Sequence, residues 1–435
     1  MADDFGSRVR SRDVVIGVVG LGYVGLPLAT AFAESGFRTL GFDSDRERIA
    51  ALSDGISVID DVSSERIGAI VSAGHLSVSS SPVVLAAADV VFICVPTPID
   101  RAKVPDHSHV NIGNRTVAGV LRAGMLVILQ STTYPGTTTE IVQPILEAGG
   151  LRAGSDFHIA FSPERVDPGN KTWTVRNTPK VVGGLTPACT ERAKLVLEAV
   201  MDDPGLVKTV AGPATAEMAK LLENTYRAVN IALVNEFAML AHEMGIDVWE
   251  VIEAAASKPF GFQAFAPGVG PGGHCIPVDP HFLSWKAREF DFQTKFIEVA
   301  ADVNAGMARY VLTRLHELMN RHERTLNGAS VLCLGASFKH GVSDVRNSRA
   351  IRVMELLEEA GARVDYVDNL VPMLTLRGSD RKSLTLGDVT VARYDVAVVL
   401  VAGAEWPFAE LEAAGVPVFD AVNASGAEGR LRERL

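Results

Sequence analysis

The sequence contains little cysteine, and its cysteines are not paired along the chain. The 435 residues include only Cys94, Cys189, Cys275 and Cys333, and none of them forms a C-x-x-C motif. So few thiols exclude a disulfide framework, and the lack of pairing excludes a zinc ribbon. We therefore expect a protein of a reducing compartment, the cytoplasm.

Positive charge is also in short supply. Lysine and arginine number 41 against 52 aspartates and glutamates, which gives a net charge of −11. Nucleic acids and anionic membranes are bound through their phosphates by an excess of cations, so neither is an expected partner. No matching set of acidic or cysteine ligands accompanies His107 and His109, and we expect no metal site.

One stretch lacks charge for long enough to resemble a membrane span or a signal peptide. Residues 14–33 have no charged side chain over 20 residues and follow Arg8, Arg10 and Arg12. Four glycines and one proline interrupt the stretch, and these residues fit a strand, a tight turn and a helix better than a span. We expect the strand–turn–helix and no membrane segment.

Apolar runs alternate with helical periodicity towards both ends of the chain. Strands that alternate with helices predict parallel sheets. The predicted fold class is α/β, with two Rossmann-like, doubly wound parallel sheets joined by a long central helix. The apolar runs that predict buried strands are residues 14–19, 37–42, 90–95, 125–130, 330–335, 363–368, 394–402 and 416–419.

The middle of the chain is mainly helical. Residues 214–244 show uninterrupted helical periodicity over a length well above that of an average helix. A stretch rich in glycine and proline follows at 257–280, and a second helical block covers about 295–320. A helix of this length joins domains or forms a subunit interface. We predict three domains, at residues 1–210, 211–322 and 323–435.

The first predicted strand leads into Gly20-Leu21-Gly22-Tyr23-Val24-Gly25. Glycines at this spacing permit a tight turn, close approach of the backbone to a pyrophosphate, and close packing of helix on strand. The pyrophosphate then lies at the helix N-terminus, where free N–H groups favour negative charge. Asp43, at the end of the second strand, can accept hydrogen bonds from a ribose and would repel a 2′-phosphate. The motif predicts NAD binding; the alternative is a glycine-rich turn without a ligand.

Cys275 differs from the other cysteines in its surroundings. It lies in the segment GGHCIPVD (272–279), where glycines allow a ligand to approach and an acid follows four residues later. A nucleophilic thiolate needs such an accessible loop with a base or cation nearby. Cys94 and Cys333 fall in predicted strands, where a small buried hydrophobic side chain is the ordinary interpretation.

The long helix carries a polar stripe on one face. Its members share that face by their spacing, and they are Glu217, Lys220, Asn224 and Arg227. A solvated surface is the ordinary interpretation of such a stripe, although a neutral asparagine between two cations favours a functional one. The apolar residues that we expect to supply the buried faces are Leu221, Leu222, Val229, Leu233, Phe237 and Leu240.

Seven segments between residues 14 and about 423 carry a family resemblance. They read GLGYVGLPLA (20–29), VPTP (95–98), STTYPGTT (131–138), SPERVDPGN (162–170), AEMAKLLENTYRAVNIALVNE (216–236), GGHCIPVDP (272–280) and SFKHGVSDVRNS (337–348). Together they resemble the UDP-glucose/GDP-mannose dehydrogenase family, which oxidises nucleotide sugars by four electrons. The resemblance implies NAD as cofactor, a UDP-sugar as substrate held by the C-terminal domain, and a homodimer or dimer-based oligomer formed through the long helix.

The resemblance also implies catalytic roles. Cys275 would capture the C6 aldehyde as a thiohemiacetal, which a second hydride transfer converts to a thioester that water hydrolyses to the uronic acid. Lys220 and Asn224 would stabilise negative charge on oxygen. Asp279, with Thr132 and an ordered water, would move protons in the oxidation steps, and Glu164 would govern hydrolysis of the thioester.

Two sets of binding residues follow from the same resemblance. The expected cofactor residues are Gly20, Gly22, Tyr23, Val24, Gly25, Asp43, Arg48, Thr97, Thr132 and Arg346. The expected residues for the nucleotide sugar are Glu164, Arg165, Val166, Lys220, Asn224, Arg227, Phe265 and Gly272 with the loop between them, and Lys339. The charge of Lys339 alone suits a diphosphate.

The substrate branch is read from three segments. STTYPGTT, SPERVDPGN and GGHCIPVDPHFLSWKA resemble the UDP-N-acetylhexosamine branch more than the UDP-glucose branch, where the cysteine loop commonly reads GGYCLPKD. We favour UDP-N-acetylglucosamine, with UDP-N-acetylmannosamine, UDP-N-acetylgalactosamine and UDP-glucose as alternatives. Departures from the family pattern are Pro271, Ser343 and Asn347-Ser348-Arg349. The other classes considered are a two-electron NAD-dependent hydroxyacid dehydrogenase, which needs no nucleophilic cysteine, and an NAD-sensing module without turnover.

Overall fold

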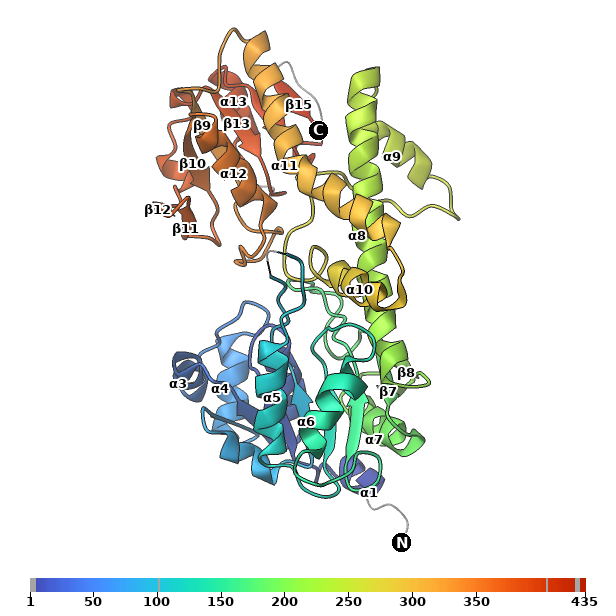
Figure 1. The fold of residues 1–435 in the computed structure, drawn as a ribbon. Coiled ribbons are helices and arrows are strands. Elements are labelled where there is room, and N and C mark those ends of the chain that lie inside the picture. Colours follow the sequence, from blue (N-terminus) through green and yellow to red (C-terminus); the bar gives the residue numbers. More distant parts are fainter. Residues whose placement is uncertain (1–4, 101, 404–405, 427–430) are drawn as a thin grey trace. The chain divides into compact units, whose positions relative to one another are not determined.

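The computed structural model describes residues 5–100, 102–403, 406–426 and 431–435, which form two compact units (Figure 1). The first unit holds the chain up to Glu223 together with His281–Phe292, and the second holds Asn224–Pro280 and the chain from Gln293 onwards. The division between the units therefore falls inside two helices, α8 (Pro213–Met244) and α10 (Asp279–Ala287).

The first unit is built on an eight-stranded sheet with the strand order β3-β2-β1-β4-β5-β6-β7-β8. Neighbouring strands run parallel throughout, except that β7 runs antiparallel to β6. The predicted parallel sheet is thus confirmed from β3 to β6, and a reversed β7 extends it. The strands are β1 (Ile16–Val19), β2 (Thr39–Phe42), β3 (Leu76–Ser79), β4 (Val90–Ile93), β5 (Leu126–Leu129), β6 (His158–Phe161), β7 (Lys180–Gly184) and β8 (Val207–Thr209).

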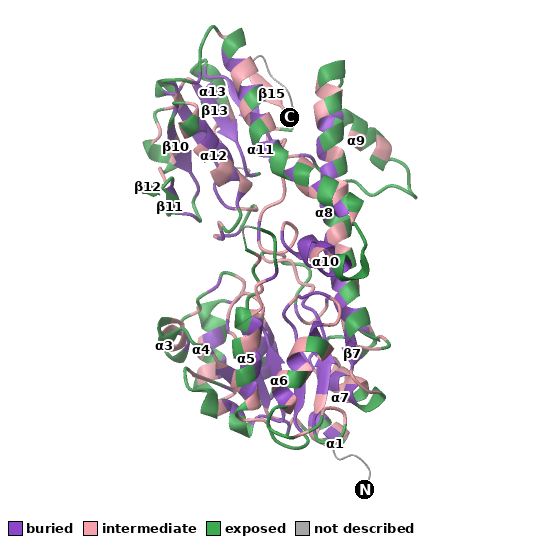
Figure 2. Ribbon diagram, in the orientation of Figure 1, coloured by how far each residue is buried: buried purple, intermediate pink, exposed green. Residues whose placement is uncertain are grey.

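Helices cover both faces of this sheet, as Figure 2 shows from the buried strands between them. Apolar side chains of α1, α2, α4 and α7 form one core cluster with the strands, and those of α5 and α6 form a second cluster. Two cores on one sheet are the mark of a doubly wound fold. The helices are α1 (Phe5–Arg10), α2 (Gly25–Glu34), α3 (Arg46–Ser53), α4 (Ser64–Ser72), η1 (Pro82–Ala87), α5 (Ser108–Ala118), η2 (Thr138–Val142), α6 (Gln143–Glu147), α7 (Pro187–Glu198), η3 (Pro204–Leu206) and η4 (Arg288–Phe290).

The uncharged stretch at 14–33 folds as β1, a turn and most of α2. All four residues of β1 are buried, as a central strand of a covered parallel sheet requires. In the described part of the chain, no helix combines the length and the apolar character that a membrane crossing demands.

The second unit contains a five-stranded, fully parallel sheet with the order β10-β9-β13-β14-β15, and a separate hairpin of β11 and β12. It confirms the second strand–helix alternation predicted near the C-terminus. The elements beyond α8 are α9 (Val248–Ala256), α11 (Lys295–Arg321), β9 (Ser330–Leu334), α12 (Arg349–Glu359), β10 (Arg363–Val367), β11 (Met373–Leu376), β12 (Ser379–Lys382), η5 (Leu386–Asp388), η6 (Val391–Arg393), β13 (Val396–Val399), α13 (Phe408–Ala413), β14 (Val418–Asp420) and β15 (Arg432–Arg434).

The burial of α8 corrects one prediction. Its polar stripe is buried, with exposed fractions of 0% at Glu217, 8% at Lys220 and 3% at Asn224, and only Arg227 of the stripe is exposed. Four apolar residues expected to be buried are instead exposed by half or more: Leu222, Leu233, Phe237 and Leu240. They form one outward-facing stripe with Met218, Tyr226 and Met244, because these positions recur at helical spacing.

Candidate active site

The glycine turn after β1 is shaped for close approach of a ligand. Gly20 has a φ of +88°, a conformation that L side chains rarely adopt, and a Cβ there would lie 2.5 Å from the carbonyl oxygen of Cys94. A Cβ on Gly25 would lie 1.8 Å from the carbonyl oxygen of Gly20. No side chain caps α2 at Val24. Leu26 and Leu28 already donate to the carbonyls of Gly22 and Val24. The N-terminus of α2 therefore presents the positive end of its dipole to an anion such as a pyrophosphate.

Asp43 lies directly beside this turn. Its Oδ2 accepts a hydrogen bond from the backbone N–H of Leu21 at 2.8 Å, and its Oδ1 accepts one from Asp45 at 3.0 Å. Arg48, from the first turn of α3, donates to Oδ2 at 2.8 Å. The carboxylate is thus fixed at the end of β2 with its charge partly balanced by Arg48, and the residues present fit the adenosine end of NAD.

Two loops expected to line the cofactor site meet after β4 and β5. The hydroxyl of Ser131 accepts from the backbone N–H of Val95 at 2.9 Å and donates to the carbonyl of Val95 at 2.8 Å. This pair of hydrogen bonds ties the segment of Thr97 to that of Thr132. Both threonines are half-buried.

Glu217 fixes the rest of the second loop onto α8. Its carboxylate accepts hydrogen bonds from the backbone N–H of Gly136 at 2.6 Å, the backbone N–H of Thr138 at 2.9 Å and the hydroxyl of Thr138 at 2.7 Å. The sequence indicates Glu217 only as a member of the polar stripe. Burial raises the pKa of this carboxyl group. Lys220 lies one turn further along the same helix.

Glu164, three residues beyond β6, forms a buried ion pair with Lys180 at the start of β7. The Nζ of Lys180 lies 2.8 Å from each carboxylate oxygen, and its side chain has no exposed surface. The backbone N–H groups of Arg165 and Val166 also donate to Oε1, at 2.7 and 3.1 Å. Burial alone would raise the pKa of Glu164, but Lys180 and these hydrogen bonds lower it below its usual value.

The guanidinium of Arg165 is engaged by two neighbouring groups of the protein. Its guanidinium lies 2.7 Å from Oε1 of Glu223 on α8, and its Nη1 donates to the carbonyl of Pro179 at 2.8 Å. These contacts connect the segment after β6 to both α8 and the residue before Lys180. A role of Arg165 toward substrate would use the remaining donors of the guanidinium.

The cysteine loop of the second unit forms a turn that leads into α10. The carbonyl of Cys275 accepts from the backbone N–H groups of Val278 and Asp279, at 3.0 and 2.8 Å. Asp279, only 2% exposed, accepts a hydrogen bond at 2.5 Å from the side-chain amide of Asn224 on α8. Three predicted catalytic residues, Cys275, Asp279 and Asn224, are therefore brought together, and Cys275 is half-buried while the other three cysteines are buried.

The loop between β9 and α12 cradles the cysteine loop. A Cβ on Gly272 would lie 2.8 Å from Cβ of Phe338, and Gly273 has a φ of +83°, so the two chains pack at a distance that only glycine permits. Asn347 donates from its side chain to the carbonyl of Gly273 at 3.0 Å. The departure from the family pattern at this position thus has a structural use.

Arg346 is bound to Asp344 in the same loop. Its Nη2 lies 2.6 Å from Oδ2 of Asp344 and 3.3 Å from Nδ1 of His274, the residue before Cys275. Burial would raise the pKa of Asp344, but Arg346 lowers it. Arg346 is otherwise exposed, and Lys339, Phe265 and Gly272 are half-buried.

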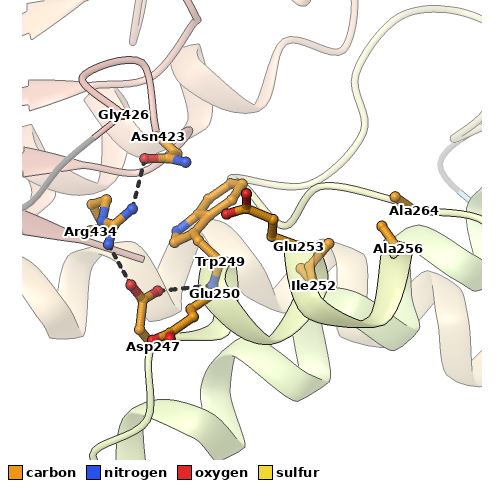
Figure 3. Close-up of a pocket in the computed structure, with 10 residues that line it drawn as sticks. All are labelled: Asp247, Trp249, Glu250, Ile252, Glu253, Ala256, Ala264, Asn423, Gly426 and Arg434. Atoms are coloured by element: carbon orange, nitrogen blue, oxygen red, sulfur yellow. Dashed lines mark hydrogen bonds and ion pairs between the residues drawn. The ribbon is translucent and has the colours of Figure 1, made fainter. Parts of the chain in front are cut away.

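A cavity in the second unit is lined by none of the predicted site residues. It has a volume of about 500 Å³ and lies between α9, the 423–426 turn and β15 (Figure 3). Arg434 there bonds to Asp247 and Asn423, and Trp249 is one of the residues that line the cavity. No group of three or more metal-ligating side chains was found in the described residues.

The sequence did not predict the contributions of three residues to this site. They are Lys180, Asp344, and Glu217 as the acceptor that holds the loop at Gly136 and Thr138. The sequence did contain a signal for Lys180, because this lysine stands at the start of the apolar run KVVGG (180–184). A charged residue in a buried strand is rarely left unpaired. Nothing local indicated that its partner would be Glu164.

Comparison with known proteins identifies the family of the chain. Three models of the UDP-glucose/GDP-mannose dehydrogenase family match, for the NAD-binding domain at residues 14–201, the central domain at 214–306 and the UDP-binding domain at 332–425. The chain is 38% identical over 359 residues to a UDP-N-acetyl-D-glucosamine 6-dehydrogenase of Pseudomonas aeruginosa, covering 82% of this chain and 83% of the relative.

Two further relatives carry different sugar names. An NDP-N-acetyl-D-galactosaminuronic acid dehydrogenase of Ralstonia nicotianae is 34% identical, over 89% of this chain and 90% of the relative. The solved UDP-D-ManNAc dehydrogenase of Pyrococcus horikoshii superposes with a TM-score of 0.87 at 32% identity, covering 97% of this chain and 99% of that chain. The chain belongs to the UDP-glucose/GDP-mannose dehydrogenase family and is an NAD-dependent oxidoreductase with a UDP-binding domain.

Proposed function

We propose that the protein oxidises C6 of a UDP-N-acetylhexosamine, with UDP-N-acetylglucosamine as the favoured substrate, to the corresponding uronic acid. The hydrogen bond between Asn224 and Asp279 is the observation that supports this most, because it fixes α8 to the turn that presents Cys275. A two-electron hydroxyacid dehydrogenase needs no nucleophile at this turn. The relatives named for N-acetylated sugars favour that substrate class and leave the epimer to experiment.

The residues divide the reaction between them. NAD held at the glycine turn and Asp43 would supply the hydride acceptor for both oxidations of C6. Asp279 is held to receive or return a proton, and the Asn224 amide beside it can donate to oxygen carrying negative charge. Cys275 forms a bond from sulfur to C6 of the aldehyde, and this bond persists as a thioester after the second oxidation. Water then attacks C6, the C–S bond breaks, and the electron pair returns to sulfur.

Lys220 would supply the positive counterpart to Asn224. The two residues are one helical turn apart on α8, both buried, so they share a face. An ammonium group in such a dry environment stabilises an alkoxide or oxyanion far more than it would in water. Glu164 would act in hydrolysis of the thioester.

We also propose the three-part division 1–210, 211–322 and 323–435, a cytoplasmic location and a homodimer formed through α8. The exposed stripe of Leu222, Tyr226, Leu233, Phe237 and Leu240 supports the dimer, since a run of large apolar side chains on one helix face is the ordinary signature of a helix–helix interface. Replacing Phe237 by Glu is expected to give a monomer in light scattering; an unchanged mass would contradict the interface.

The test of the reaction counts NADH formed per sugar consumed. We expect two NADH with UDP-N-acetylglucosamine and little turnover of UDP-glucose; UDP-N-acetylmannosamine and UDP-N-acetylgalactosamine complete the series. The variant Cys275→Ala is expected to lose four-electron turnover by at least about 10³-fold, as removal of a covalent nucleophile does. Cys189→Ala, outside the proposed site, is the matched control. One NADH per sugar, or normal uronate from Cys275→Ala, would overturn the thioester route.

A further inference from the structure

The ion pair between Glu164 and Lys180 is buried in the first unit. Lys180 is fully buried and Glu164 is 9% exposed, and the two come from the loop after β6 and the first residue of β7. Removing two charges from water costs several kcal/mol for each ion, and a buried pair is often no more stable than apolar residues of the same volume. Stability alone therefore gives no reason for this pair, whereas a role for the carboxylate does.

The two oxygens of Glu164 are not equally engaged. Oε1 accepts from Lys180 and from the backbone N–H groups of Arg165 and Val166, which fills its acceptor capacity. Oε2 accepts from Lys180 at 2.8 Å, and its other neighbour, the side-chain amide of Gln130, is distant at 3.4 Å. A carboxylate oxygen with one strong donor retains a lone pair for a water molecule.

We propose that Lys180 is a positioning residue for thioester hydrolysis, which holds Glu164 as a fixed carboxylate with Oε2 directed to the attacking water. This inference rests on the proposed function and adds the group on which Glu164 depends. In the hydrolytic step the water oxygen bonds to C6, the C6–S bond breaks with its electron pair returning to Cys275, and the water proton passes by way of Oε2 to solvent.

The titratable groups near Glu164 in the described part of the chain include two cations and one thiol. Lys180 reaches it from β7, and the thiol of Cys94 lies at the end of β4, where burial keeps it neutral by raising its pKa. The guanidinium of Arg165, next in the chain, is directed to Glu223 on α8. Lys180 is accordingly the cation that sets the ionisation of Glu164 against the opposing effect of burial.

Removal of this cation has a predictable sign. Wild-type Glu164 has a lowered pKa, so it stays ionised throughout the neutral range and contributes no acid limb there. In Lys180→Met, burial acts without its counterion and raises the pKa of Glu164 relative to wild type. Hydrolysis by this variant is then expected to fall about tenfold for each pH unit below the new pKa, and to recover at alkaline pH.

The experiment follows acyl-enzyme decay in the full-length enzyme with NAD and UDP-N-acetylglucosamine. Quenched samples between pH 5.5 and 9 are analysed by intact mass for the uronyl thioester on Cys275. We expect the thioester to accumulate in Lys180→Met at low pH and not at high pH. Lys180→Arg, which keeps the charge, should restore the wild-type profile, and Lys180→Met should add little to the defect of Glu164→Gln.

A purely structural role would give a different result. It would lower the melting temperature of Lys180→Met and reduce its rate by one factor at every pH, and that outcome overturns the proposal. Should Lys180→Met fail to fold, Lys180→Gln keeps a hydrogen-bond donor without the charge and carries the same expectation. Failure of the proposed function is distinguishable, because wild type itself would then form no thioester and yield no two NADH per sugar.

Discussion

The first strand of each sheet is followed by the same kind of glycine turn, but the segments after the two turns differ. In the first unit β1 is followed by Gly20, with φ of +88°, and Asp43, directly after the neighbouring β2, accepts the N–H of Leu21. In the second, β9 is followed by Gly335, with φ of +94°, and Asp368, directly after β10, accepts the N–H groups of Ala336 and Ser337 at 2.8 and 3.0 Å. A glycine turns the chain in each case, and a carboxylate from the next strand fixes the turn.

The difference lies in how soon the helix follows. In the first unit α2 begins at Gly25, so its N-terminus faces the turn directly. In the second, α12 begins only at Arg349, and the long intervening loop carries Lys339 and Arg346. A short glycine turn offers backbone N–H groups to a pyrophosphate, whereas a long loop offers side chains. The same frame thus serves an NAD-binding domain and a UDP-binding domain with different recognition groups.

Alanine in place of the two turn glycines should separate the two binding functions. In Gly20→Ala the new Cβ would lie 2.5 Å from a backbone carbonyl oxygen, and in Gly335→Ala 2.4 Å from Cβ of Val401. Each clash costs about 1–3 kcal/mol. We expect NAD affinity to fall at least about tenfold in Gly20→Ala with UDP binding retained, and the converse in Gly335→Ala, both measured by calorimetry.

Gly74→Ala provides the control for backbone strain. Gly74 also has positive φ, at +74°, but a Cβ there would meet nothing within 4 Å. Its replacement should cost about 1 kcal/mol of stability and leave both affinities unchanged. Loss of NAD and UDP binding together in either turn variant would show that the units do not divide the ligands in this way.

Asparagine in place of the two carboxylates that fix these turns is expected to have smaller effects. Asp43→Asn keeps one acceptor oxygen but releases Arg48, whose Nη1 now bonds to the carboxylate at 2.8 Å. We expect NAD affinity to fall about tenfold and the preference against NADP to weaken, because a freed arginine suits a 2′-phosphate. Asp368→Asn should lower the melting temperature without altering coenzyme preference. A change of coenzyme preference in Asp368→Asn would contradict the assignment of NAD to the first unit and UDP to the second.

The sequence sufficed for the turn of the first unit because every part of it is local. The strand, the glycines and the helix are consecutive, and Asp43 follows at the distance that one helix and one strand require. The equivalent turn of the second unit lacks the spaced glycines, so its pattern predicted the sheet but not the role of Asp368. The family resemblance, rather than periodicity, supplied Lys339 and Arg346.

Contacts between distant segments were out of reach for the same reason. Glu217 binds a loop 79 to 81 residues earlier, and Lys180 pairs with a carboxylate across a strand reversal that periodicity does not report. The faces of α8 were assigned by polarity, which assumes that the helix packs within a single chain. In this protein the buried polar face belongs to the candidate site, and the exposed apolar face is the surface of the proposed homodimer.

The smallest expected effect compares a buried thiol from each sheet. Cys94 follows β4 and Cys333 lies within β9, and burial raises the pKa of both far above the neutral range. Burial would also raise the pKa of Cys189, but hydrogen bonds with His158 and Thr186 lower it to about 7. In a Cys275→Ala background at pH 7.5, we expect iodoacetamide to label Cys189 slowly and to leave Cys94 and Cys333 unmodified. When the pH is varied, the labelling rate of Cys189 should be half-maximal near pH 7.

Labelling of the two core thiols then requires opening of the sheet that holds each one. Under increasing urea the rate at Cys94 reports opening of the first sheet, and the rate at Cys333 reports opening of the second. Because the first sheet has eight strands and the second five, we expect Cys333 to react at a lower urea concentration. If both thiols began to react at the same urea concentration, the two sheets would unfold as one cooperative block. The two sheets would then be alike in stability as well as in their first turns.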